Sequence, residues 1–327
     1  MVLILDRNDV QKVLTMKEAI TVVEEGFREL AEGRVQMPPR QLMTEPERNG
    51  WIAVMPAYIK KTKALATKVV TVFTENPKIN LPTTIATILL NDPETGRPLA
   101  IMDAGYLTAI RTGAVGGVAA KHLARSEAHT AGIFGAGFQA RAQLEALCEV
   151  RAIDEVYVYD VMSEASKKYA EDMSLRLGIN VTSVEKPERA VKGCGIIVTA
   201  STSTKPVFHG SWLEPGTHIT GIGSHMANTR ELDTEAVRRS KVIVDLREAA
   251  EKEYGEILIP VSEGSLTLDH IYGELGEIIT GRKQGRKDDQ EITLFKSGGL
   301  AIQDTAAAHL AYSKALKAGI GTEIKLQ

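Results

Sequence analysis

Three basic side chains stand where a positive charge is costly unless it has a partner. Lys68 interrupts the apolar run LATKVVTV, Arg111 lies among alanines and glycines in AIRTGAVGG, and Arg40 follows the tripeptide MPP. Burial of an unpaired cation is unfavourable, whereas an Arg fork can bind a carboxylate through two hydrogen bonds. Each residue alone also fits a surface or ion-paired cation. Together they predict a binding site for a small anionic substrate.

A glycine-rich turn in the middle of the chain predicts a second site, for a dinucleotide. Gly135, Gly137 and Ala140 form the pattern G-x-G-x-x-A directly after the apolar run Ala131–Phe134. The first glycine allows the turn, the second lets the backbone approach a pyrophosphate, and the alanine lets the helix pack close to the strand. The N-terminus of that helix then offers free N–H groups to the phosphates. Strand, turn and helix together are the context that this fingerprint requires.

An acidic residue at the end of the next expected strand indicates which dinucleotide binds. Asp160 follows Glu155–Tyr159 and is placed to accept hydrogen bonds from the hydroxyls of the adenosine ribose. Its carboxylate repels a 2′-phosphate, and Val161 and Met162 supply no compensating Arg. NAD is therefore expected, and NADP is disfavoured. The residues assigned to the cofactor from these elements and from later loops are Gly135, Ala136, Gly137, Phe138, Gln139, Asp160, Thr199, Ala200, Ser201 and Gly223.

His225 is the remaining candidate for proton transfer. It follows the expected strand Thr217–Gly221, in a loop at the carboxyl end of the sheet, where open α/β sheets bind ligands. An imidazole there could give or take a proton near neutral pH, although a loop histidine without a role fits equally well. The sequence contains no G-x-S-x-G elbow and no convincing Cys and His pair, which excludes covalent hydrolase chemistry.

Composition narrows the class of protein further. The chain has 327 residues and a formal net charge of −3 without a basic block, so two domains are expected and neither nucleic acid nor an anionic membrane is expected as a partner. No apolar run reaches the roughly 18 residues of a membrane span, and no signal peptide is apparent, so a cytoplasmic location is expected. Cys148 and Cys194 are expected to stay reduced, and no metal-binding spacing of Cys or His occurs.

The elements that must position these residues change character along the chain. Before residue 117, β-rich runs follow one another directly, which predicts an antiparallel or mixed sheet, and a small-residue helix over 108–125 leads out of this region. From residue 131 onward, six expected strands alternate with helices, which predicts a doubly wound parallel sheet. After residue 245 the pattern weakens, until a last helix over 299–317 presents an alanine-rich face.

Motifs spread over nearly the whole chain resemble one known family. They include MPPR ending at Arg40, VMPAY, LATK ending at Lys68, LPT ending at Thr83, ETGRPLAIMD, AIRTGAVGG, GAGFQA and ITLFKSGGLAIQD. The sequence resembles the ornithine cyclodeaminase/μ-crystallin family, which also contains archaeal-type alanine dehydrogenases and cyclic ketimine reductases. The resemblance implies an α/β protein with a Rossmann NAD-binding domain over 118–299. It also implies a discontinuous α+β domain, over 1–117 and 300–327, for substrate binding and dimerisation as a homodimer.

Residue by residue, the resemblance adds roles to this site. Arg40, Lys68 and Arg111 match the family's substrate-binding cations, and Thr83 matches a residue beside the substrate. Thr112 matches a residue that touches the cofactor phosphates. By the same resemblance, Asp160 is the acid that binds the ribose.

One loop departs from the family pattern. Ornithine cyclodeaminases carry an Asp followed by C-P-G-K where this chain has the segment 223–228, and His225 stands at the Asp position. The departure disfavours ornithine cyclisation. Archaeal alanine dehydrogenases of the family also tend to carry the Asp, so alanine remains open as a substrate.

The leading hypothesis is an NAD(H)-dependent oxidoreductase that acts on the C–N bond of a small L-amino acid or cyclic imino acid. Lys68, Arg111 and His225 are its catalytic candidates. One alternative is a lyase, ornithine cyclodeaminase, which regenerates NAD in each cycle. The other is a non-enzymatic crystallin-type protein that only binds the dinucleotide, which the intact basic residues disfavour.

Overall fold

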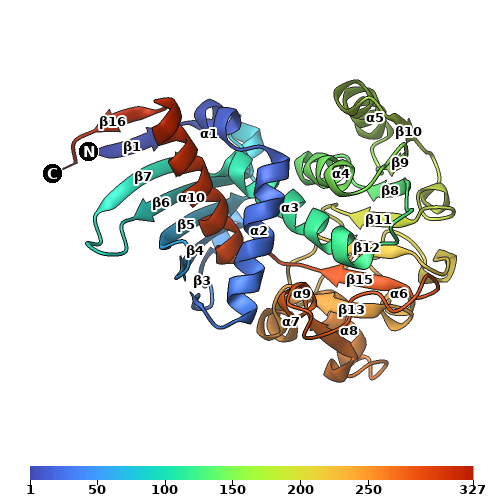
Figure 1. Cartoon of the computed structure of the whole chain (residues 1–327). Helices are drawn as coiled ribbons and strands as arrows, with labels where there is room; N and C mark the ends of the chain where they lie inside the picture. The colour runs from blue at the N-terminus through green and yellow to red at the C-terminus, as the bar shows by residue number, and fades with distance from the viewer. Residues whose placement is uncertain (327) are drawn as a thin grey trace. The chain divides into compact units, whose positions relative to one another are not determined.

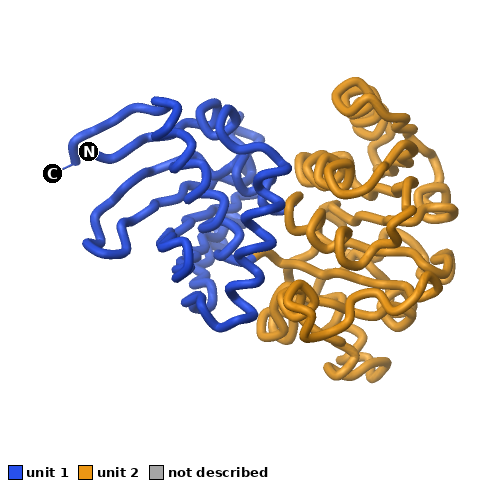
Figure 2. The backbone as a smooth tube through the Cα atoms, in the orientation of Figure 1, with its two compact units in different colours: residues 1–112, 300–327 blue, residues 113–299 orange. Residues whose placement is uncertain are grey.

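The chain forms two compact units, described here from a computed structural model that covers residues 1–326 (Figure 2). Unit 1 comprises Met1–Thr112 and the segment from Leu300 onward, and unit 2 comprises Gly113–Gly299. The first boundary therefore lies earlier than residue 117, inside helix α3 (Gly105–Leu123). The cause is close packing, because a Cβ atom at Gly116 would lie 1.8 Å from Oε1 of Gln143 in unit 2. The second half of α3 thus packs as part of unit 2.

Unit 1 is built on a mixed eight-stranded sheet. Its order is β16-β1-β7-β6-β5-β4-β2, with β3 also paired to β4. Only the β1 and β7 pair is parallel among these pairs; the others are antiparallel, as directly adjacent strands predicted. The strands are β1 (Val2–Leu5), β2 (Val35–Gln36), β3 (Gln41–Glu45), β4 (Gly50–Ile59), β5 (Ala64–Phe73), β6 (Thr84–Asn91), β7 (Pro98–Asp103) and β16 (Thr322–Ile324).

Helices cover one face of this sheet. Figure 1 shows α2 (Met16–Ala31) and α10 (Ala301–Ala318) side by side across the strands. The short helix α1 (Arg7–Val13) precedes α2 in the chain. A capping box of Thr15 and Glu18 begins α2. The alanine-rich face of α10 packs against α2 and also directly against β4, β5 and β6. Small side chains allow this close approach of helix to sheet.

Unit 2 contains an eight-stranded, fully parallel sheet in the order β10-β9-β8-β11-β12-β15-β13-β14. The six predicted strands are all present. The sequence missed β14 and β15, each only four residues long, and β15 inserts between β12 and β13. The strands are β8 (Thr130–Phe134), β9 (Glu155–Tyr159), β10 (Asn180–Ser183), β11 (Ile196–Thr199), β12 (His218–Gly221), β13 (Lys241–Val244), β14 (Ile271–Glu274) and β15 (Thr293–Lys296).

Both faces of the parallel sheet are buried. Successive side chains of one strand enter different cores: Ile133 and Phe134 of β8 do so, as do Ile196 and Ile197 of β11. One core is completed by α3, α4 and α5 and the other by α6, α7 and α8. This is the predicted doubly wound α/β architecture. The helices are α4 (Phe138–Val150), α5 (Ser163–Leu177), α6 (Thr234–Arg238), α7 (Arg247–Glu253), α8 (Gly255–Ser262) and α9 (Leu275–Ile279).

Both cysteines of unit 2 are free thiols. Cys194 is buried and Cys148 is half-buried. Burial raises the pKa of the Cys148 thiol to about 11 and that of Cys194 to about 12, so both stay protonated at neutral pH. Among residues 1–326, no helix is both long and apolar enough to cross a membrane.

Candidate active site

A buried cluster of two cations and one carboxylate lies in unit 1. Alternation along β5 puts Lys68 on the face that α10 covers, in a row with Met55 of β4 and Ile88 of β6. Nζ of Lys68 lies 2.7 Å from Oδ2 of Asp304, and Nε of Arg111 lies 2.9 Å from Oδ1 of the same carboxylate. The three side chains are at most 7% exposed. The structure thus brings together the two predicted cations, through a residue that the sequence did not single out.

Gln303, the neighbour of that carboxylate in α10, belongs to the same cluster. Its Oε1 accepts a hydrogen bond from Nη1 of Arg111. Its Nε2 is buried and has no hydrogen-bond partner among the described residues. Burial without a partner leaves a polar donor unsatisfied, which is unfavourable until an acceptor binds. A carboxylate entering the cluster would supply that acceptor.

Positive charge is in excess in this cluster. Burial lowers the pKa of the Lys68 ammonium to about 8, the Arg111 guanidinium beside it acts in the same direction, and Asp304 opposes them. The charge of Arg40, which directly precedes β3, also lowers the pKa of Lys68. Thr83, half-buried, directly precedes β6. Lys68 and Arg111 thus share one carboxylate, and the charge of Arg40 acts on Lys68 as well, an arrangement that favours a further anion.

The glycine-rich turn of unit 2 has the geometry that its sequence predicted. Gly135 has a φ of +97°, and a Cβ atom there would lie 2.6 Å from the backbone oxygen of Ala200. The turn thus touches the loop after β11, where the strand order reverses, and ligands bind at such a switch point. A Cβ atom at Gly137 would meet no protein atom within 4 Å, so protein packing does not demand glycine there. A glycine at this position is explained by the space that an approaching pyrophosphate requires.

The N-terminus of α4 lacks a side-chain cap. Gly137 is its N-cap residue, no side chain caps it, and its first turn contains no acidic residue. By contrast, α1 and α2 are closed by capping boxes. Phe138, exposed, and Gln139, half-buried, occupy the first turn. Without a side-chain cap or an acidic residue, the positive end of the helix dipole is available to the phosphates of a dinucleotide.

Asp160 joins the turn to the end of β9. Its Oδ2 accepts from the N–H of Ala136 at 2.9 Å, and its Oδ1 accepts from the N–H of Met162 at 2.9 Å. A carboxylate has about four lone-pair sites, so these two bonds leave acceptors for ribose hydroxyls. Val161 and Met162 beside it are exposed and carry no positive charge. The acid therefore both shapes the turn and fits NAD.

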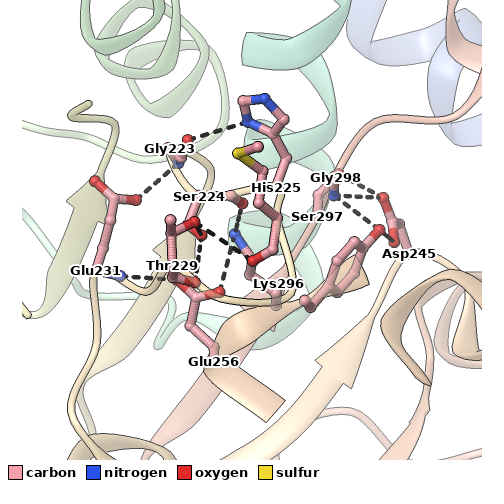
Figure 3. Close-up of polar contacts among 12 residues, drawn as sticks. Gly223, Ser224, His225, Thr229, Glu231, Asp245, Glu256, Lys296, Ser297 and Gly298 are labelled. Carbon is pink, nitrogen blue, oxygen red and sulfur yellow. Dashed lines mark hydrogen bonds and ion pairs between the residues drawn. The ribbon is translucent and has the colours of Figure 1, made fainter. Parts of the chain in front are cut away.

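Two later loops are held by a carboxylate that the sequence did not reveal. The N–H and the hydroxyl of Ser201 and the N–H of Gly223 all donate to Glu231. Because these N–H groups already donate to Glu231, Ser201 and Gly223 would contact the cofactor through the shape of their loops and through carbonyl oxygens. His225 lies further along, exposed, with Nδ1 3.4 Å from the carbonyl oxygen of Gly223 (Figure 3).

The other two predicted cofactor residues are hydroxyl-bearing threonines. Thr112 lies in α3 and donates its hydroxyl to the carbonyl oxygen of Thr108 at 2.7 Å. Thr199 ends β11, is fully buried, and has no hydrogen-bond partner for its hydroxyl among residues 1–326. Both remain predictions as cofactor contacts.

Asp304 was missed although the sequence carried a signal for it. It falls on the alanine stripe of the last helix, at helical spacing with Ala301, Ala308, Ala311 and Ala315. A carboxylate on a buried stripe requires a cation, just as Lys68 on a buried strand face requires an anion. That Lys68 and Asp304 are partners becomes evident only when the fold is known.

Comparison with known proteins gives consistent results over the whole chain. The model of the Ornithine cyclodeaminase/mu-crystallin family matches residues 2–319. An alanine dehydrogenase of Archaeoglobus fulgidus is 44% identical over 326 residues, which cover 99% of this chain and 98% of that protein.

Two solved structures are similar in fold as well as sequence. The Thermococcus litoralis Delta(1)-pyrroline-2-carboxylate reductase in complex with NADH and L-proline is 48% identical, with a TM-score of 0.96, and the match covers 99% of this chain and 100% of that chain. An archaeal alanine dehydrogenase dimer with bound NAD is 43% identical, with a TM-score of 0.94 and coverage of 100% and 99%.

Substitution of the predicted ribose acid tests the cofactor assignment. Asp160→Ser keeps an acceptor near the turn but removes the negative charge. We expect the Kd for NADH to rise about tenfold, since hydrogen bonds to a charged group are lost, and the preference for NADH over NADPH to shrink. Fluorescence titration with both cofactors measures this. The control is Asp154→Ser before the start of β9, which should change neither value; an unchanged preference in Asp160→Ser would contradict the assignment.

Neutralising the shared carboxylate tests the buried cluster. Asp304→Asn leaves Lys68 and Arg111 buried without their counter-charge, and the free energy of unfolding should fall by about 3–5 kcal/mol. Glu18→Gln is the control: its ion pair with Lys314, at 2.7 Å, is about one-third exposed, and Gln preserves the capping box. That change should cost at most about 1 kcal/mol in urea unfolding. An equal fall in the free energy of unfolding for Asp304→Asn and Glu18→Gln would show that the cluster is not a buried charge network.

Proposed function

Since the chain belongs to the ornithine cyclodeaminase/mu-crystallin family, we propose that it is an NAD(H)-dependent oxidoreductase acting on the C–N bond of a small amino acid or cyclic imino acid. The observation that carries the proposal is the cluster of Lys68, Arg111 and Asp304, with the orphan donor of Gln303 beside it. A carboxylate is the common feature of the substrates in this class.

The relatives support the same class of reaction. They are an alanine dehydrogenase and a Delta(1)-pyrroline-2-carboxylate reductase, and two of their structures contain NAD or NADH. The predictions of an enzyme, of an amino-acid or imino-acid oxidoreductase and of NAD as cofactor are thereby confirmed.

The residues of unit 1 have distinct tasks in the proposed reaction. Arg111 and protonated Lys68 bind the carboxylate of the substrate, and the free amide N–H group of Gln303 donates a further hydrogen bond. A bound nicotinamide would supply a hydride to the carbon of the C=N bond, or would accept it in the reverse direction. Lys68 can give the accompanying proton to the nitrogen. Fixed placement of the carboxylate holds the neighbouring carbon in line for transfer, which supplies much of the rate.

The same cluster disfavours a substrate with a second amine. Asp304 is the carboxylate in contact with these cations, and both of its oxygens are engaged by them. It is therefore not available to bind the side-chain ammonium of ornithine. His225, in place of the family's Asp, supplies no carboxylate either. The proposed substrates are accordingly a cyclic imino acid or the imine formed from an oxo acid and ammonia.

A spectrophotometric assay with purified protein tests the proposed function. NADH is mixed with pyrroline-2-carboxylate, with piperideine-2-carboxylate, or with pyruvate plus ammonium, and NAD is mixed with ornithine. We expect NADH to be consumed with an imino acid or with pyruvate plus ammonium. Conversion of ornithine to proline and ammonia without net change in NADH would establish the lyase instead. NADH binding without turnover of any compound would support a binding protein.

Lys68 gives the reaction a predicted pH dependence. Its pKa near 8 means that the protonated form, which binds the carboxylate and carries the proton, is present below pH 8 and is lost above it. Reduction should therefore slow as the pH rises through about 8. Lys68→Ala should lower kcat at least about a hundredfold, and NADH should still bind. Lys68→Arg, which keeps its charge, should lose the inflection; wild-type turnover in Lys68→Ala would remove Lys68 from the mechanism.

We propose in addition that the protein is a homodimer that pairs through the uncovered face of the unit 1 sheet. On the face opposite α10, the register places Met43, Ile52, Thr71 and Ile85 in one row across β3 to β6. Met43 is 58% and Ile85 44% exposed. An exposed apolar patch of this kind is typical of an interface, and a similar alanine dehydrogenase is a dimer.

A charge introduced into this patch tests the proposed dimer. Ile85→Asp should shift the protein from dimer to monomer in light scattering coupled to size-exclusion chromatography, because a buried unpaired carboxylate opposes association. Leu175→Asp is the matched control, since Leu175 is 90% exposed on α5 and lies outside the patch. A wild-type monomer, or a dimer that survives Ile85→Asp, would contradict the proposed interface.

A further inference from the structure

Glu231 is a fully buried carboxylate at the carboxyl edge of the parallel sheet. Its Oε1 accepts from the N–H of Ser201 at 2.7 Å and from the hydroxyl of Ser201 at 2.6 Å. Its Oε2 accepts from the N–H of Gly223 at 2.7 Å (Figure 3). The two loops that it joins follow the neighbouring strands β11 and β12. One side chain therefore holds together both loops that the sequence assigned to the cofactor.

Gly223 is required by this contact. A Cβ atom at this position would lie 2.2 Å from the backbone oxygen of Ser201 and 2.5 Å from Oε1 of Glu231. Neither distance is tolerable, and the nearer atom belongs to the backbone. The glycine thus allows the two loops to meet directly, with the carboxylate closing the contact.

A second buried carboxylate and a buried ammonium hold Glu231 in place. Oε1 of Glu256 accepts from the backbone N–H of Glu231 at 2.9 Å. Nζ of Lys296, at the end of β15, lies 3.5 Å from Oε2 of Glu256 and donates to the carbonyl oxygen of Ser224. Lys296 and Glu256 are fully buried. Figure 3 shows Lys296 in contact with both Glu256 and Ser224.

The network therefore fixes one loop from both sides. Gly223 is bound by Glu231, Ser224 is bound by Lys296, and the hydroxyl of Ser224 donates to the carbonyl oxygen of Thr229 at 2.7 Å. His225 follows immediately, and its Nδ1 lies 3.4 Å from the carbonyl oxygen of Gly223 in the same loop. The backbone that carries this imidazole is thus held at the two residues before it.

We infer that Glu231 is a positioning residue of the reaction: by clamping the loop of Gly223 to the loop of Ser201, it sets the affinity for the dinucleotide and the placement of His225. The inference rests on the proposed function only in that these loops bind the cofactor. Glu231 touches neither cofactor nor substrate in this role. It acts through the two loops, as outer partners of a binding site commonly do.

Glu231→Gln tests the inference, because the amide keeps the size of the side chain but turns one acceptor into a donor that faces an N–H group. We expect the Kd for NADH in fluorescence titration, and the KM for NADH, to rise about tenfold or more. The KM for the imino acid, whose proposed ligands lie in unit 1, should not change. A raised KM for NADH with an unchanged KM for the imino acid distinguishes misplaced cofactor loops from a general loss of structure.

Glu29→Gln is the matched control. Glu29 is also fully buried and accepts from Arg34 at 2.6 and 2.8 Å, but it lies in α2 of unit 1. Its substitution should lower thermal stability to a similar degree and leave the Kd for NADH unchanged. Equal Kd values in wild type and Glu231→Gln, or an equal rise in both variants, would overturn the inference. A wild type that binds no NADH would instead overturn the proposed function.

A double-mutant cycle keeps the test independent of folding defects. Ser201→Ala removes the hydroxyl that donates to Glu231 and that accepts from the N–H of Ser203 at 3.2 Å, and it should raise the Kd for NADH in the wild-type background. In the Glu231→Gln background it should have little further effect, because the clamp is already broken. Fully additive effects would overturn the inference. If Glu231→Gln does not fold, Ser201→Ala decides alone: a raised Kd with unchanged imino-acid KM supports the clamp, and an unchanged Kd overturns it.

Discussion

The shared carboxylate of Asp304 is the constraint on which unit 1 depends. Lys68 comes from the middle of a strand and Arg111 from a helix, and both are buried where an unpaired cation would be strongly unfavourable. The last helix of the chain supplies the counter-charge, and so the C-terminal segment must fold onto the N-terminal sheet. The single carboxylate does not neutralise both cations. The charge that remains is what a substrate carboxylate can bind.

Carboxylates organise unit 2 in a comparable way. Asp160 holds the glycine-rich turn, and Glu231 joins the next two loops along the sheet. Asp245 accepts from Tyr254, Ser297 and the N–H groups of Gly298 and Gly299, from which the chain continues into α10 (Figure 3). A parallel sheet brings the carboxyl ends of its strands to one edge, and acids at this edge bind backbone N–H groups that would otherwise be unsatisfied.

The sequence predicted what local patterns determine. The β-rich runs before residue 117 indicated the mixed sheet of unit 1, the alternation of strands and helices gave six strands of unit 2, and the glycine fingerprint predicted a dinucleotide turn. The sequence did not reveal the short strands β2 and β16, nor β15, whose four residues end in Lys296, nor the pairing of Lys68 with Asp304. Both depend on contacts between residues far apart in the chain. Glu231 likewise looks like an ordinary surface acid until two loops are seen to converge on it.

In the proposed reaction, hydride reaches a carbon next to a carboxylate held by Lys68 and Arg111. The most direct measurement is NMR of the product formed with NADH that carries deuterium at the transferred position. We expect one deuterium on the α-carbon of the amino acid for each NADH consumed. A product without deuterium at the α-carbon would contradict it.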